Sequence, residues 1–138
     1  MKLLRCLVVD DDELGRELLI LNLQGIAICD TAVNGREALD KFIASRQNDS
    51  PYDLIFLDIV MPVMDGHEAA KAIRHIEQEE GITTGNRVNI IVLSSLNTPK
   101  DIIESYVAVQ SAAHLVKPVK PEKLLKTLRK LELVPEEV

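Results

Sequence analysis

The sequence predicts an α/β protein built around a parallel β-sheet, and three observations lead to that prediction. Short apolar runs alternate five times with longer segments whose apolar residues recur at helical spacing. The run at 54–57 is apolar at every position, which is typical of a strand buried on both faces of a parallel sheet. Most of these runs end directly in polar or charged residues, at the sheet edge where α/β proteins bind their ligands.

The first strand is predicted over residues 5–9 and the first helix over residues 13–24. Asp12 is placed to cap this helix, and Gly25 is placed to end it. The apolar face of the helix is expected to consist of leucines three or four positions apart: Leu14, Leu18 and Leu21.

The second strand is predicted over residues 26–33, and a helix opens after it at Asn34-Gly35. The third strand is the run at 54–57, which ends in Asp58. Asp65-Gly66 then marks a turn before a third helix. The apolar positions of these two helices recur at helical spacing: Ala38, Leu39, Phe42 and Ile43 in one, and Ala69, Ala70, Ile73 and Ile76 in the other.

The second half of the chain adds two strand–helix pairs. The strands are predicted over residues 89–93 and 113–116, and the helices begin near Thr98 and Pro121. The last helix turns four leucines inward: Leu124, Leu125, Leu128 and Leu131. Five strands alternating with five helices predict a flavodoxin-like, doubly wound parallel sheet with the strand order 2-1-3-4-5.

That strand order brings several polar strand ends together. The ends of the first and third strands become neighbours, so Asp10, Asp11 and Asp58 share one crevice. Taken singly, each polar end has an ordinary explanation: the acids can cap a helix, Ser94 can begin one, and Lys117 can be a surface charge. Their joint position at one sheet edge favours a functional site.

Composition narrows the class of protein. The 138 residues are 46% hydrophobic and 28% charged, which favours a single globular domain over residues 1–132 with a tail at 133–138. No apolar run reaches the roughly 18 residues of a membrane span, and the chain does not start with a signal peptide, so a cytoplasmic protein without a membrane partner is expected. The net charge of −6 disfavours direct nucleic-acid binding. Residues 117–130 carry six basic residues and one acid, where a solvated helix face is favoured over a partner surface.

The cysteines and histidines indicate neither disulfides nor zinc. Cys6 and Cys29 both lie in apolar, strand-like segments and are expected to be small buried hydrophobic residues rather than a disulfide. The three histidines, His67, His75 and His114, share no metal-ligand spacing with each other or with a cysteine.

The three carboxylates of the acidic crevice, Asp10, Asp11 and Asp58, indicate what this crevice can bind. Three carboxylates within about 4–6 Å of one another repel by several kcal/mol, so such a cluster binds protons or a cation. An all-oxygen site with room for water suits Mg²⁺, which usually takes one or two carboxylates and leaves coordination positions for a phosphate. Lys117 adds a positive charge, and the Ser94 hydroxyl can donate to an anionic oxygen. This set of groups favours transfer of a phosphoryl group onto Asp58.

With these residues in place, the chain resembles the receiver domains of two-component response regulators. The resemblance rests on four stretches that span nearly the whole chain: Leu7-Val8-Val9-Asp10-Asp11, the ten residues from Leu57 to Gly66, Ile91-Val92-Leu93-Ser94-Ser95 and Val116-Lys117-Pro118. Their combination is highly specific.

The resemblance implies a role for each residue of the acidic crevice. Asp58 would be the phospho-acceptor, and Asp11 would be a direct Mg²⁺ ligand. Asp10 would assist, usually through water, and Val60 would offer its backbone carbonyl to the metal.

The other two polar strand ends also receive roles from the resemblance. Ser94 would be the switch hydroxyl that turns towards the phosphoryl group, and Lys117 would pair with that group. A cis peptide bond is expected before Pro118, in keeping with the strong preference of cis bonds for proline.

The chain departs from the family pattern at three places. The aromatic switch position corresponds to His114, which could reorient and add pH sensitivity or could have no signalling role. Val119 stands where phenylalanine is frequent. The positions flanking the acceptor, Val60 and Leu96, are apolar rather than polar, which predicts slow autodephosphorylation.

The implied function is a phosphorelay switch rather than an enzyme, since the domain catalyses only its own phosphorylation and dephosphorylation. A histidine kinase or histidine phosphotransfer protein would supply the phosphoryl group. A downstream protein would contact the face made by the fourth helix, fifth strand and fifth helix, and the same helices would allow phosphorylation-dependent dimerisation. The chain could act alone or as a receiver of a longer hybrid kinase or multidomain regulator, and no DNA-binding output domain is expected in it.

Three alternatives fit the residues less well. An aspartate-nucleophile phosphohydrolase would place a second aspartate two residues after the first, where this chain has Val60. A flavodoxin-like electron carrier would need a loop rich in glycine and hydroxyl groups after the first strand, where this chain has three acids. A non-phosphorylated scaffold of the same fold would be expected to lack Asp58 or Lys117.

Overall fold

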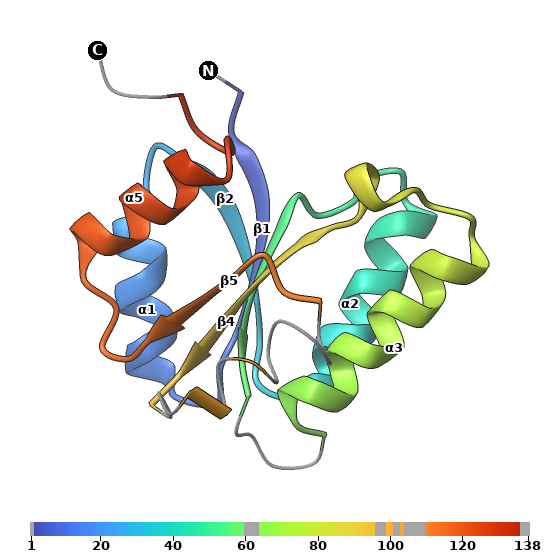
Figure 1. The fold of residues 1–138 in the computed structure, drawn as a ribbon, viewed down its shortest axis with the longest axis horizontal. Coiled ribbons are helices and arrows are strands. Elements are labelled where there is room, and N and C mark those ends of the chain that lie inside the picture. The colour runs from blue at the N-terminus through green and yellow to red at the C-terminus, as the bar shows by residue number, and fades with distance from the viewer. Residues whose placement is uncertain (1, 60–63, 96–98, 101–102, 104–109, 136–138) are drawn as a thin grey trace.

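A single parallel sheet lies between two layers of helices in the computed structural model of the 138-residue chain (Figure 1). The structure describes residues 2–59, 64–95, 99–100, 103 and 110–135. Helices α1 (Glu13–Asn22) and α5 (Pro121–Lys130) cover one face, and α2 (Gly35–Gln47) and α3 (Gly66–Glu79) cover the other. A 3₁₀ turn, η1 (Thr84–Asn86), follows α3.

The sheet has the predicted topology. Its strands are β1 (Leu4–Val9), β2 (Ala27–Ala32), β3 (Leu54–Asp58), β4 (Asn89–Ser94) and β5 (Ala113–Val116). They run in the order β2-β1-β3-β4-β5, and every neighbouring pair is parallel. All five residues of β3 are buried, which confirms the expectation drawn from its unbroken apolar run.

The described part of the chain contains four α-helices rather than the five that were predicted. The remaining predicted helix, expected to begin near Thr98, falls largely outside the described residues. Asp12, Asn34 and Asp65 cap α1, α2 and α3, each accepting a hydrogen bond from the backbone N–H three residues on. None of the helices in the described ranges is long and apolar enough to cross a membrane.

Each face of the sheet packs against its helices through a separate apolar core. On the side of α2 and α3 the core includes Leu7, Phe42, Ile55 and Ile73. On the side of α1 and α5 it includes Cys6, Leu23, Phe56, Leu124 and Leu128. Leu125 and Leu131 pack against this second core, as predicted, and Val134 is buried in it.

The predicted apolar face of α1 was wrong. Leu14, Leu18 and Leu21 are 61%, 51% and 59% exposed, whereas Leu19 and Leu23 are buried against the sheet. At about 100° per residue the two sets of leucines lie on opposite sides of the helix. Since both sets have helical spacing, the spacing alone does not say which one faces the sheet.

Candidate functional site

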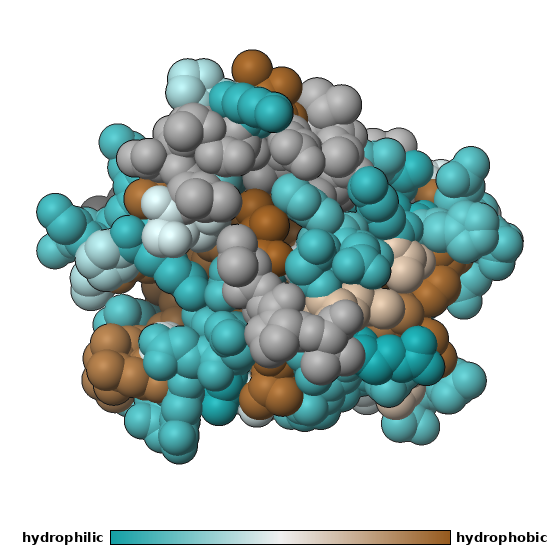
Figure 2. Space-filling model, turned by 90° about the horizontal axis from the view of Figure 1, so that it is seen from below, coloured by the Kyte–Doolittle hydropathy of each residue, from teal (hydrophilic) through white to brown (hydrophobic). Residues whose placement is uncertain are grey.

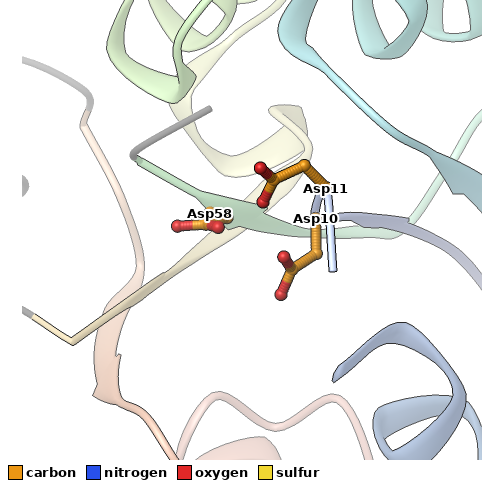
Figure 3. Close-up of side chains that lie close together, drawn as sticks. All are labelled: Asp10, Asp11 and Asp58. Carbon is orange, nitrogen blue, oxygen red and sulfur yellow. The ribbon is translucent and has the colours of Figure 1, made fainter. Parts of the chain in front are cut away.

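Three carboxylates meet at the carboxyl edge of the sheet (Figure 3). Asp10 and Asp11 directly follow β1, and Asp58 is the last residue of β3. One carboxylate oxygen from each lies within 4.8 Å of the others. Asp10 is 2% exposed and Asp58 is 6% exposed, whereas the Asp11 side chain is exposed to solvent.

The strand register explains why these acids meet. Val9 of β1 lies opposite Leu57 of β3, so the next residue of each strand, Asp10 and Asp58, falls at the same level of the sheet. On the other side of β1, the backbone N–H of Asp10 donates to the carbonyl of Ala32, the last residue of β2, at 3.1 Å, so the pairing of β1 with β2 holds Asp10 in line with its strand. Two buried strands therefore fix the spacing of the carboxylates before any ligand arrives.

Lys117, the residue after β5, reaches across to the same cluster. Its Nζ lies 2.6 Å from Asp10 Oδ2 and 3.2 Å from Asp58 Oδ2. Burial alone would lower the pKa of Lys117, but the hydrogen bond to Asp10 and the charges of Asp58 and Asp10 outweigh it and hold that pKa above its ordinary value. Lys117 is therefore positively charged at neutral pH.

One ammonium group does not neutralise three carboxylates. With Lys117 protonated and all three acids ionised, the cluster keeps an excess of two negative charges in a partly buried place. The donor set is all oxygen, and one of its members is open to solvent. Both properties fit a hard divalent cation such as Mg²⁺ that retains water ligands.

The two oxygens of Asp10 already have partners within the chain. Oδ1 accepts from the backbone N–H of Asp12 at 2.9 Å, and Oδ2 accepts from Lys117. The Asp10 carbonyl in turn accepts from Arg16 Nη1 at 2.7 Å. Asp11, whose side chain is open to solvent, is therefore better placed than Asp10 to coordinate a cation directly.

The predicted switch residues lie on the two neighbouring strands. Ser94, 1% exposed, ends β4, and its carbonyl accepts from the Lys117 N–H at 2.8 Å. The Lys117–Pro118 bond is cis, as expected. His114 is half-buried on β5, where it borders a groove lined by α5 rather than the acidic cluster. Val60 and Leu96 lie outside the described residues.

Sequence reasoning did not identify how closely α3 approaches Asp58. Gly66, the first residue of α3, donates its N–H to the Ile59 carbonyl at 2.9 Å. A Cβ atom at this position would lie 2.3 Å from the Asp58 carbonyl oxygen, so only glycine fits. The Asp-Gly dipeptide indicated a turn, but this close packing depends on contacts that no local pattern encodes.

A groove beside the cluster was also missed. It has a volume of about 330 Å³, and its wall includes Leu14 and Leu18 of α1, Lys117 and the two residues that follow it, Pro118 and Val119. Figure 2, which looks at the carboxyl edge, shows hydrophobic side chains on the side where α1 and α5 lie. The groove therefore joins an apolar helix face to the charged site.

Comparisons with known proteins agree with this fold. The family model for the response regulator receiver domain matches residues 6–129. The two-component response regulator ORR41 of Oryza sativa subsp. japonica is 35% identical over 135 residues, covering 96% of this chain and 97% of ORR41.

Two solved structures share the fold at full domain length. The receiver domain of the histidine kinase CKI1 from Arabidopsis thaliana, complexed with Mg²⁺ and BeF₃⁻, is 29% identical with a TM-score of 0.78, covering 94% of this chain and 89% of that one. The receiver domain of Ssk1 from Saccharomyces cerevisiae, in a co-crystal with the histidine phosphotransfer protein Ypd1, is 25% identical with a TM-score of 0.79, covering 97% and 94%.

An acidic cluster and a lysine at the carboxyl edge of this sheet define the class as a receiver. The chain belongs to the response regulator receiver domain family and functions as a phosphorelay receiver in two-component signal transduction.

Proposed function

We propose that Asp58 is the residue of this receiver that accepts the phosphoryl group from a phosphohistidine. The observation that carries the proposal is the position of its carboxylate, which ends a fully buried strand, lies 3.2 Å from Lys117 Nζ and shares a cluster with Asp10 and Asp11. A carboxylate oxygen of Asp58 attacks phosphorus, the bond to the histidine nitrogen breaks, and an aspartyl phosphate forms.

Mg²⁺ is the cation proposed for the acidic cluster. Asp11 and Asp58 would bind it directly, Asp10 would bind it through water, and the Val60 carbonyl, outside the described residues, would complete the protein's share. The bound ion would neutralise charge on the phosphoryl oxygens and on the acids. The negative charge of the three acids that Lys117 does not neutralise supports this assignment.

Lys117 and Ser94 would then respond to the new phosphoryl group. Lys117 Nζ already bridges Asp10 and Asp58, so it can donate to a phosphoryl oxygen with a small movement. Ser94 ends the strand next to β3 and can donate its hydroxyl hydrogen to another oxygen. Because the Ser94 carbonyl binds the Lys117 N–H, a movement of one residue affects the other.

The face that changes would be that of the fourth helix, β5 and α5. His114 and three exposed lysines of α5, Lys123, Lys126 and Lys130, line a groove of about 270 Å³ on this face. Their charge favours a downstream protein with an acidic surface. His114 would be the residue that reorients there, and phosphorylation-dependent dimerisation would use the same elements.

The donor would approach along the exposed leucines of α1. A phosphohistidine that reaches Asp58 must place its protein over the neighbouring surface, and the apolar groove that includes Leu14 and Leu18 borders the acidic cluster. Ssk1, which shares this fold, has been crystallised with a histidine phosphotransfer protein. A helical donor with an apolar contact face fits this groove.

The acceptor is tested by intact mass after incubation with acetyl phosphate and Mg²⁺. The wild type should gain one phosphoryl group, and Asp58→Asn should gain none while remaining folded. Asp40→Asn, which changes an exposed acid on α2, is the matched control and should behave as the wild type. Phosphorylation of Asp58→Asn at the wild-type rate would disprove the assignment.

The docking surface needs a separate experiment with two donors. Leu18→Asp should slow transfer from a phosphorylated phosphotransfer protein by about tenfold or more, since one interface anchor is worth at least about 1.4 kcal/mol. Transfer from acetyl phosphate, which needs no docking, should not change. Ile28→Asp alters an equally exposed apolar residue on β2 and is the control. Equal slowing with both donors would instead indicate damage to the site.

A further inference from the structure

Two cysteines lie side by side in the sheet, away from the acidic cluster. Cys6 of β1 is the direct register partner of Cys29 of β2, and both side chains belong to the core on the side of α1 and α5. Neighbouring strands are about 4.8 Å apart, and disulfides form between Cα atoms roughly 4.4–6.8 Å apart. The two backbones therefore already lie within the distance that a disulfide requires.

The two thiols differ in access and acidity. Cys6 is fully buried, whereas Cys29 is half-buried on the edge strand of the sheet. A hydrogen bond between the thiols lowers the pKa of Cys29, and the same bond together with burial raises the pKa of Cys6 well above its ordinary value. A thiolate is the reactive form of cysteine, so Cys29 is the better nucleophile and Cys6 is protected.

We propose that Cys6 and Cys29 form a reversible thiol–disulfide site, in which Cys29 reacts first with a low-molecular-weight disulfide and Cys6 then closes the bond between β1 and β2. This inference is independent of the proposed phosphoryl chemistry. The bond would close a loop that contains Asp10, Asp11 and α1, so it would restrain the segment that carries two acids of the site and the exposed leucines.

The chemistry is an exchange of disulfides. The Cys29 thiolate attacks one sulfur of the small disulfide, breaks its S–S bond and releases one small thiol, which leaves a mixed disulfide on Cys29. Cys6 loses its proton, attacks Cys29 Sγ and releases the second small thiol. The protein loses two protons and two electrons, and the small disulfide is reduced to two thiols.

The test is exposure of the folded wild type to glutathione disulfide, followed by intact mass and peptide mapping. The expected product has lost two hydrogen atoms, carries no glutathione, contains a Cys6–Cys29 link and returns to the starting mass with dithiothreitol. An unchanged mass would overturn the proposal. So would a stable glutathione adduct on the wild type, or links only between separate chains.

Two variants assign the order of attack. Cys6→Ala should stop at one glutathione on Cys29, because the second thiol is absent, and Cys29→Ala should take up none while it remains folded. Alkylation of the reduced wild type with iodoacetamide tests the same order without a substitution in the core, and Cys29 should be labelled well before Cys6. Labelling of Cys6 as fast as Cys29 would overturn the proposed roles.

Discussion

Two groups of charged residues in this molecule, both with buried acids, differ in how far their charges are balanced. At the carboxyl edge of the sheet, three carboxylates face one lysine. On α3, Arg74 and Glu77 form an ion pair at 2.6 Å, with Glu77 fully buried. Arg74 also donates to the carbonyls of Val88 and Gln110, and Glu77 accepts from the Val88 N–H at 2.7 Å.

The comparison shows which property distinguishes a functional cluster from a structural one. Both groups contain buried acids, Asp10 and Asp58 in one and Glu77 in the other, and both are hydrogen-bonded, so these two properties do not distinguish them. The charges of Arg74 and Glu77 cancel, and the hydrogen bonds from Arg74 connect α3 to Val88 and Gln110, in the segments that precede β4 and β5. The sheet-edge cluster keeps an excess of negative charge, which favours a cation, and the proposed Mg²⁺ would in turn attract a phosphoryl group.

The largest expected effect is a loss of folding stability when the Arg74–Glu77 ion pair is broken. Glu77→Ala removes the buried carboxylate that binds both Arg74 and the Val88 N–H, and the free energy of unfolding should fall by about 3–5 kcal/mol, measured by urea denaturation. Glu79→Ala removes an acid of α3 that is 68% exposed and should cost about 1 kcal/mol or less. Similar losses in the two variants would mean that the buried pair has no special structural role.

Mg²⁺ should stabilise the folded protein by binding to the cluster of Asp10, Asp11 and Asp58. At a concentration of 100 times its dissociation constant, the ion should raise the free energy of unfolding of the wild type by about 2.7 kcal/mol. Asp11→Asn removes a proposed ligand and should lose most of that gain, as thermal melts with and without Mg²⁺ would reveal. Equal stabilisation of both proteins would place the bound ion elsewhere.

Removing one charge from the unbalanced cluster should stabilise the metal-free protein. In Asp58→Asn, the repulsion from Asp10 and Asp11 disappears together with the attraction to Lys117, and the free energy of unfolding should rise by about 1 kcal/mol. Urea denaturation in the presence of EDTA measures this change. Asp40→Asn, on an exposed helix face, should change stability by less than about 0.5 kcal/mol. A destabilised Asp58→Asn would mean that the attraction to Lys117 exceeds the repulsion.

The smallest expected effect is the pH dependence of the contribution that Lys117 makes to the free energy of unfolding. Because the pKa of Lys117 is raised in the folded state, the stability it supplies is complete below its ordinary value of 10.5 and is lost as the pH rises through the higher, folded-state pKa. The stability difference between the wild type and Lys117→Met should therefore be constant from about pH 6 to about pH 9 and shrink in stronger alkali. A change near pH 7 would indicate another titrating group.

The sheet-edge cluster and the Arg74–Glu77 pair also differ in how far the sequence could predict them. Asp10, Asp58, Ser94 and Lys117 were identified because each lies at or directly after the end of a strand, and a parallel sheet brings these ends to one edge. The sheet order followed from the alternation of apolar runs and helical segments. These signals are local, and the regular geometry of the sheet converts them into positions in space.

Features that depend on particular contacts between distant residues had no such signal. Arg74 and Glu77 resemble any exposed pair three residues apart, and their burial follows from the approach of Val88 and Gln110. The face of α1 was predicted wrongly because that helix has apolar stripes on both sides, and only packing on β1 selects Leu19 over Leu18.

The glycine at the start of α3 has a consequence for genetics. A screen of all single substitutions for loss of signalling should return Gly66 as readily as Asp58, although Gly66 has no side chain to perform chemistry. The two classes of mutant would differ in protein abundance. Substitutions at Asp58 would leave normal amounts of an inactive protein, whereas even alanine at Gly66 would separate α3 from the strand and lower the amount of folded protein in the cell.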